Sequence, residues 1–458
     1  MSTRDVADNI SPLDYRYWDH DIAGYLSDAT FLRYKLTVEL ALVRALHKHG
    51  VAPADVVQEL EAAVPGVSFD EVRVEESRVG HDIRAMVNVL RRRVSDKAKP
   101  FVHMTATSYD IIDTANALRF RDTVRQLLIP SLKDAERVLL ELALREAETV
   151  QIGRTHGQHA VPITFGYAIA GYVSRLGGCI EALDALAREL KGKFSGAVGA
   201  YNASNLFFVD PEAFERDVLA EVDLAPHEHS TQVAPHEPVV RLLTEVGIAV
   251  GVLADLADDM RHLERSEIGE VSEAFGEHQV GSSTMPQKRN PISFEQVKSL
   301  WKIIIPRLQT VLMDQLSEHQ RDLTNSASSR TYGEIIAYAT VAARRVAESM
   351  RTLTVNKGRL ERNLLMSRGA IAAEPLYITL ASMGHPNAHE KVRQLTREAE
   401  RAHMMLADVA EGNTELTPYF ERMTYNQRRI IKNPALYAGV AAKKASAIAT
   451  RWRQKLGL

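Results

Sequence analysis

Long stretches of the chain carry apolar residues at helical spacing. Between Pro238 and Ile268 the apolar positions step by three or four residues, which places them on one face of a helix, close to a heptad seam. These positions are Val239, Leu242, Val246, Ala249, Leu253, Leu256, Met260 and Leu263. Similar spacing predicts further helices over 29–49, 55–63, 110–148 and 163–190. Helices of this length indicate a bundle.

Prolines limit where these helices can run. Pro130 interrupts the apolar pattern of 110–148, because an interior proline removes a helical hydrogen bond. No proline occurs between Pro306 and Pro375, so a single helix of roughly forty residues, about 60 Å at 1.5 Å per residue, is feasible there. Few segments show strand-like alternation. We therefore expect an all-α fold.

The helical pattern changes twice along the chain, which suggests three domains. Short helices and polar turns fill residues 1–106, long helices fill 107–354, and shorter helices with more turn residues fill 355–458. A chain of 458 residues is long for a single core, which agrees with several domains. The apolar seams of the central helices look too extensive for one chain to cover, so we expect an oligomer.

Composition narrows the class of protein. A hydrophobic content of 45% and a charged content of 25% are ordinary for a soluble globular protein. A net charge of −3 argues against nucleic acid or a membrane surface as partner. The single cysteine, Cys179, excludes an intramolecular disulfide framework and fits a reducing compartment. No signal-peptide pattern or membrane-spanning run is present, so we expect a cytoplasmic protein.

One polar stretch, 275–291 (FGEHQVGSSTMPQKRNP), follows neither the helical nor the strand period. It gathers hydroxyl, amide and cationic groups, namely those of Ser282, Ser283, Thr284, Lys288, Arg289 and Asn290. Asn290 is a predicted N-cap and Pro291 a predicted first helical residue, so an anion-favouring helix N-terminus would follow. We interpret the stretch as a loop that closes over a carboxylate-bearing substrate; a surface loop with a capped helix is the alternative.

Two further polar segments lie beside predicted helices. In 103–110 (HMTATSYD), Thr107 and Ser108 are either substrate contacts or simple helix caps. In 321–330 (RDLTNSASSR), two arginines with hydroxyls between them suit phosphate or carboxylate recognition. A solvated, charged turn of a long helix is the alternative for that second segment.

A histidine-containing segment, 153–162 (GRTHGQHAVP), also stands out. His156 and His159 are candidate acid or base groups, because histidine titrates near neutrality. No cysteine or close carboxylate joins them, so we expect no zinc site.

The string GSSTMPQKRNP at 281–291 resembles the signature loop of the fumarase/aspartase superfamily. Other segments make the resemblance closest to its adenylosuccinate lyase family: SPLDYRY at 11–17, GRTHGQ at 153–158, STQ at 230–232 and RDLT at 321–324. The resemblance implies an all-α, three-domain lyase with a central long-helix bundle. It also implies a homotetramer in which each active site is assembled from three subunits.

The resemblance further implies a β-elimination that releases fumarate. The substrates would be adenylosuccinate, giving AMP, and succinylaminoimidazole carboxamide ribotide, giving AICAR. Ser282 would be the general base; chemistry alone would not select a serine, because its hydroxyl is a poor base unless donors stabilise the alkoxide. His156 would be the general acid that protonates the leaving nitrogen.

Substrate-binding residues follow from the same resemblance and from the need for donors to a carbanion-like intermediate. They are Arg16, Tyr17, His81, Asp82, Thr107, Ser108, Thr155, Gln232, Ser283, Lys288, Asn290, Arg321, Ser326 and Arg330. Such an enzyme needs no metal and no redox cofactor, and its partners would be a small nucleotide substrate and other copies of the chain.

Four positions near the expected pocket depart from the family pattern: Tyr15, Gly80, Tyr109 and Asn325. They leave open another fumarate-releasing carbon–nitrogen lyase, acting on argininosuccinate, an amino acid or another N-substituted succinate. A non-catalytic helical scaffold is a second alternative, but a scaffold has no need of the polar residues singled out above.

Overall fold

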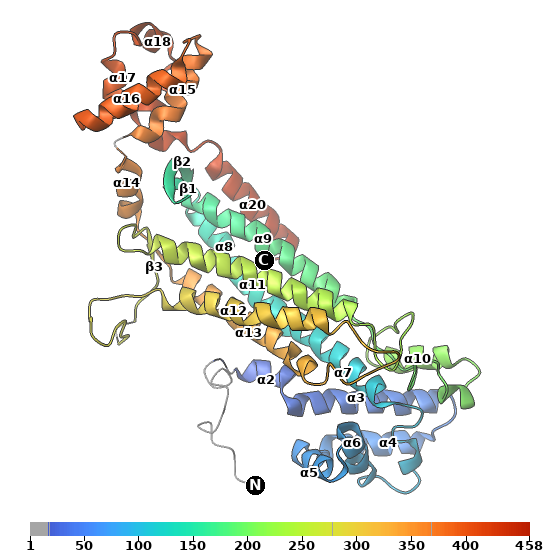
Figure 1. Cartoon of the computed structure of the whole chain (residues 1–458). Coiled ribbons are helices and arrows are strands. Elements are labelled where there is room, and N and C mark those ends of the chain that lie inside the picture. Colours follow the sequence, from blue (N-terminus) through green and yellow to red (C-terminus); the bar gives the residue numbers. More distant parts are fainter. Residues whose placement is uncertain (1–16, 18, 277, 368) are drawn as a thin grey trace. The chain divides into compact units, whose positions relative to one another are not determined.

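The structure, a computed structural model, describes residues 17, 19–276, 278–367 and 369–458. The expected all-α fold is confirmed, since helices dominate the chain in Figure 1. Two predicted features, Arg16 and the departure at Tyr15, lie outside the described residues. Among the helices of the described part, none is long and apolar enough to cross a membrane. The chain groups into two compact units, which are taken in turn.

The first unit contains the described residues up to Leu132 together with Cys179–Gly251 and Ser299–Ala343. Its complete helices are α2 (His20–Leu26), α3 (Asp28–Lys48), α4 (Ala54–Ala63), α5 (Phe69–Val79), α6 (Asp82–Arg91), α7 (Ser108–Thr123) and α10 (Pro211–Ala220). Helix α3 packs against α7 and α10. Fully buried Leu42, Phe120 and Phe214, one from each of these helices, contribute to the core.

The second unit contains Lys133–Gly178, Val252–Lys298 and Arg344–Leu458. Its complete elements are strands β1 (Val150–Thr155), β2 (Gln158–Thr164), β3 (Val271–Ser272) and β4 (Thr354–Val355), and helices α14 (Lys357–Leu365), α15 (Ala373–Ser382), α16 (Ala388–Ala402), α17 (Leu406–Glu411), α18 (Thr417–Arg422), α19 (Tyr425–Lys432) and α20 (Ala441–Leu456). Strands β1 and β2 form an antiparallel hairpin, and β3 pairs with β4. Helices α15, α16, α17 and α19 contribute to one small apolar core that includes Leu376, Leu395, Leu406 and Ile431.

Five long helices have residues in both units. They are α8 (Ile129–Arg145), α9 (Phe165–Arg188), α11 (Glu237–Leu263), α12 (Ile292–Met313) and α13 (Tyr332–Arg351). The helices predicted over 29–49, 55–63, 163–190 and 238–268 are confirmed as α3, α4, α9 and α11. The division into domains at 106 and 354 stays a prediction.

Pro130 does not end the helical path. Residues Val124–Leu128 form a single π-helical turn between α7 and α8, in which Ile129 N bonds Val124 O. Pro130 is therefore the second residue of α8. Because proline has no N–H, it needs no acceptor from the turn before it, and the wider turn carries the chain past its ring.

The helix of about forty residues considered possible between Pro306 and Pro375 does not form. Helix α12 ends at Met313, and α13 begins only at Tyr332. Polar side chains in between bond the backbone instead: Asn325 Nδ2 donates to Asp314 O at 2.7 Å, and Asp322 Oδ1 accepts from Thr324 N at 2.8 Å. Such local bonds compete with the helical ladder, so absence of proline is not sufficient for a helix.

Candidate active site

His156 lies at the tip of the β1–β2 hairpin. Arg154 pairs with His159 and Thr155 with Gln158, which leaves His156 and Gly157 as a two-residue loop. Both loop residues have positive φ, 55° and 73°, as a type I′ turn requires. The turn exposes the His156 side chain, and Thr155 beside it is exposed too. Burial and the Arg154 cation lower the pKa of His159, which favours its neutral form.

A buried carboxylate anchors this hairpin. Glu270 is fully buried and accepts from Arg154 Nη1 at 3.1 Å and Nη2 at 2.5 Å. Gln151 Nε2 and Asn363 Nδ2 each donate to it at 2.8 Å. A buried charge is tolerated only when paired and hydrogen-bonded, and Glu270 satisfies both conditions. This partner was not predicted, since Arg154 and Glu270 are far apart along the chain.

The signature loop places two backbone donors on Ser282. Met285 N donates to Ser282 Oγ at 3.1 Å and Thr284 N at 3.3 Å. Ser282 is half-buried, whereas Ser283 and Lys288 are exposed. A Cβ on Gly281 would lie 2.0 Å from Lys288 O, so only glycine allows the two arms of the loop to approach this closely. The donors required for a serine alkoxide are thus part of the loop's own fold.

The predicted start of the following helix, with Asn290 as N-cap and Pro291 as first helical residue, is wrong. Asn290 is not the N-cap, because the first helical bond runs from Glu295 N to Pro291 O. Asn290 Nδ2 instead donates to Gly281 O at 2.7 Å. The first free amides of α12, Ser293 N and Phe294 N, bond the Glu273 carboxylate at 3.2 and 2.9 Å. The chain's own carboxylate therefore occupies the anion-favouring position.

In the first unit, the predicted residues at 81–82 and 107–108 lie close together. Ser108 Oγ lies 3.4 Å from His81 Nε2, and Thr107 caps α7. His81 is itself the N-cap of α6, accepting from its third helical amide. Asp82 pairs with Lys35 at 3.1 Å. Burial raises the pKa of Asp82, but the Lys35 cation outweighs it, so the pKa stays below its usual value.

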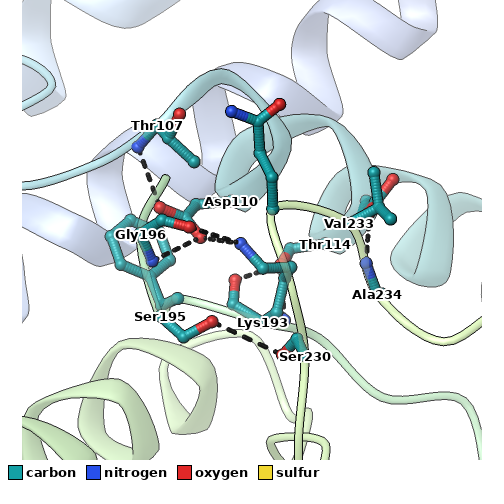
Figure 2. A network of polar contacts seen from close by, with 12 residues as sticks. Thr107, Asp110, Thr114, Lys193, Ser195, Gly196, Ser230, Val233 and Ala234 are labelled. Carbon is teal, nitrogen blue, oxygen red and sulfur yellow. Dashed lines mark hydrogen bonds and ion pairs between the residues drawn. The ribbon is translucent and has the colours of Figure 1, made fainter. Parts of the chain in front are cut away.

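A buried ion pair supports this corner of the unit, as Figure 2 shows. Lys193 is fully buried and its Nζ pairs with the Asp110 carboxylate. Asp110 also accepts from Gly196 N at 3.2 Å and from Thr107 N at 2.8 Å. Thr114 Oγ1 donates to Lys193 O at 3.0 Å and accepts from Lys193 N at 3.1 Å. The start of α7 is thereby fixed to the segment 193–196.

The same network reaches the segment that carries Gln232. Ser195 Oγ donates to Ser230 Oγ at 3.4 Å (Figure 2). Ala234 N donates to Asp113 Oδ2 at 2.7 Å. Burial raises the pKa of Asp113 to about 7. Neither Lys193 nor Asp110 was singled out from the sequence, because nothing in the local pattern around either residue points to the other.

Gln232 and Arg321, two of the predicted substrate-binding residues, lie in contact. Arg321 Nη1 donates to Gln232 Oε1 at 2.8 Å, and Gln232 N donates to Gln320 O at 3.2 Å. Ser326 and Arg330 lie exposed farther along the same segment. A cavity of about 100 Å³ is lined by Ser326, Tyr109 and others from the first unit. Tyr17 is half-buried.

Comparison with known proteins agrees with these motifs. A family described as "Lyase" matches residues 11–304, and one described as "Adenylosuccinate lyase C-terminal" matches residues 317–421. The adenylosuccinate lyase of Pyrococcus horikoshii is 37% identical over 90% of this chain and 91% of its own length. That of Pyrococcus abyssi is 36% identical over 94% of this chain and 95% of its own.

A solved structure agrees as well. The 3-carboxy-cis,cis-muconate lactonizing enzyme from Pseudomonas putida superposes with a TM-score of 0.86 at 25% identity, covering 97% of this chain and 99% of its own. Two family matches and relatives that extend over almost the full chain lead to one assignment: the chain belongs to the adenylosuccinate lyase family of the fumarase/aspartase superfamily.

Proposed function

We propose that this protein is a carbon–nitrogen lyase that cleaves adenylosuccinate to AMP and fumarate. It would act in the same way on succinylaminoimidazole carboxamide ribotide, giving AICAR and fumarate. Family membership supports the reaction class. The observation that carries the chemistry is the pair of backbone N–H groups that point at Ser282 Oγ.

In the proposed first step, Ser282 removes a proton from the carbon next to a substrate carboxylate. The electron pair of the alkoxide forms the new Oγ–H bond. The electron pair of the broken C–H bond moves toward the carboxylate. The amides of Thr284 and Met285 stabilise the alkoxide before the transfer. Lys288 and Asn290, with Thr107 and Ser108, would supply donors to the charge that develops on the carboxylate. Closure of the loop over the substrate would exclude water.

In the proposed second step, His156 gives a proton to the leaving nitrogen as the carbon–nitrogen bond breaks. An exposed imidazole on a rigid two-residue turn can reach a substrate while its backbone stays fixed. The ion pair between Arg154, in the strand that leads into the turn, and Glu270 helps to hold the turn in place. General acid catalysis of this kind contributes about 10²–10⁴-fold in rate.

Substrate binding would divide among the remaining predicted residues. Arg321, Arg330 and Ser326, with Arg16 and Tyr17, would hold the phosphate and the succinyl carboxylates. His81, Asp82, Gln232, Thr155 and Ser283 would contact the rest of the substrate. Arginine suits this work because its planar fork bonds two oxygens of a phosphate or carboxylate at once.

We also propose that the protein is a homotetramer in which three subunits contribute to each site. Exposed apolar side chains on the long helices support an oligomer, including Ile248 at 51%, Leu312 at 50% and Met313 at 71% exposure.

Sedimentation at several concentrations tests the assembly. Mixing Ser282→Ala with His156→Asn protein tests the sharing: restored activity supports it, and none at any ratio contradicts it. A cytoplasmic location and three domains (1–106, 107–354, 355–458) belong to the same proposal.

The experiment that tests the activity compares three substrates by product chromatography: adenylosuccinate, the carboxamide ribotide and argininosuccinate. The account predicts fumarate from the first two and not from the third. Fumarate from argininosuccinate alone would contradict the nucleotide assignment. No fumarate from any of them, from folded and oligomeric protein, would favour a scaffold.

A further inference from the structure

Tyr109, which departs from the family pattern, lies against a predicted anion-binding arginine. It is the second residue of α7, directly after Ser108, and is half-buried. The Arg321 Cζ atom lies 3.9 Å from the centre of its ring. That distance is well inside the range of about 6 Å over which an aromatic face attracts a guanidinium. The aromatic residue is thus a direct neighbour of the arginine's charge.

The hydrogen-bond donors of Arg321 are only partly used. Nη1 donates to Gln232 Oε1, whereas Nε is buried with no hydrogen-bond partner. No carboxylate in the described part of the chain pairs with Arg321. The nearest in sequence, Asp322, accepts instead from Glu318 N and Thr324 N, each at 2.8 Å. The buried Nε is closed to an external ligand, whereas Nη2 makes no hydrogen bond in the described part of the chain and is the end that an external acceptor can reach.

Tyr109 supplies what an acidic neighbour could not. A carboxylate beside Arg321 would neutralise the guanidinium and occupy the edge that bonds two oxygens. An aromatic ring attracts the cation through its face and carries no formal charge. Gln232 fixes the rotation of the group through a neutral amide oxygen. Asp113 and Asp322 act on this charge without bonding the guanidinium, so donors of Arg321 remain available to a ligand.

We propose that Tyr109 is a positioning residue that holds Arg321 with its Nη2 end open to an oxyanion of the substrate. The inference rests on the proposed function and adds a determinant of substrate class to it. The shared chemistry of the ligand is an anionic oxygen, from either a phosphate ester or a carboxylate. The experiment below separates these two sources.

The test measures kcat and KM for adenylosuccinate in the wild type, Tyr109→Phe and Tyr109→Leu. Removing the ring should raise KM about 5- to 30-fold, the effect of a partly desolvated cation–π contact. The change in kcat should stay within about threefold, because the interaction holds substrate and transition state alike. Tyr109→Phe keeps the aromatic face and should keep KM within about twofold.

A matched control is available in the second unit. Tyr425 is 76% exposed and also stacks on an arginine, with the Arg429 Cζ atom 5.6 Å from its ring centre. Tyr425→Leu should leave KM unchanged. Succinyladenosine, which lacks the phosphate, identifies the source of the oxyanion. If the Tyr109→Leu penalty vanishes with it, Arg321 holds the phosphate; if the penalty persists, Arg321 holds a carboxylate.

Two kinetic results would overturn the inference: an unchanged KM in Tyr109→Leu, or a rise in Tyr109→Phe as large as in Tyr109→Leu. If Tyr109→Leu does not fold, Tyr109→Met serves as the second ring-free variant. Calorimetric binding of AMP and adenosine separates this inference from the proposed function. If the protein binds AMP in a way that depends on Tyr109 but shows no turnover, the proposed function alone is refuted. Turnover with a KM independent of Tyr109 would refute the inference alone.

Discussion

The buried pair of Lys193 and Asp110 allows the sharpest prediction about stability. Replacing Lys193 with methionine keeps the length of the side chain and removes its charge. The Asp110 carboxylate would then remain buried, with the amides of Gly196 and Thr107 as its hydrogen-bond donors. Removing one partner of such a pair costs about 3–5 kcal/mol, because an uncompensated charge stays in the core.

This cost translates into a shift in melting temperature. In a cooperative unit of about 150–250 residues, 1 kcal/mol corresponds to about 2–4 °C, so Lys193→Met should lower Tm by about 6–20 °C. The double variant Asp110→Asn, Lys193→Met buries no charge, and the Asn oxygen can still accept from an amide. It should recover about 1–3 kcal/mol relative to the sum of the single variants.

The assay is thermal unfolding followed by circular dichroism at one protein concentration, since an oligomer's Tm depends on concentration. Lys97→Met is the matched control, because Lys97 pairs with Asp55 on the surface, where both side chains are more than half exposed. No resolved change in Tm is expected there, as surface pairs contribute little. A fall in Tm of less than about 2 °C in Lys193→Met, or no recovery in the double variant, would show that the buried pair does not stabilise the fold in this way.

Three further predictions concern the proposed catalytic groups and one pair of acids. Ser282→Ala should lower kcat by about 10³-fold or more with an unchanged oligomer, and an undiminished rate in a steady-state assay would exclude Ser282 as the base. His156→Asn tolerates the positive φ of the turn and should lower kcat about 10²- to 10⁴-fold at unchanged Tm; a rate within threefold of wild type would remove the general-acid role. Burial, with the Glu273 carboxylate adding to it, raises the pKa of Glu264 to about 7. Its contribution to stability is therefore present below the ordinary pKa of 4.5 and is lost as pH rises through about 7. Between pH 5 and 8 the wild type should lose Tm relative to Glu264→Gln, whereas parallel Tm curves would contradict this assignment.

The helices were predictable because their physical cause is local. In α3, α9 and α11 the apolar residues repeat at helical spacing over many turns, and that spacing alone specifies a buried face. The signature loop was equally visible, as a long polar string with no period. The β1–β2 hairpin was missed, because its turn signal, His156-Gly157, was interpreted only as chemistry. The signal that could have predicted the hairpin is a two-residue loop that ends in glycine, with alternating apolar and polar residues on both sides.

The supporting residues of the site could not be predicted from the pattern. Glu270 and Lys193 each meet their partners through the tertiary fold, and a charged residue in a sequence carries no sign that it will be buried. The expected anion site before α12 failed for a similar reason. Glu273 takes the helix amides, and its proximity to them depends on how the chain turns at β3.

Whether this chain cleaves adenylosuccinate is decided by the ultraviolet absorbance change when purified protein meets that substrate, with fumarate quantified in the same sample. We expect loss of substrate with one fumarate formed for each AMP. Folded, oligomeric protein that leaves adenylosuccinate intact would contradict it.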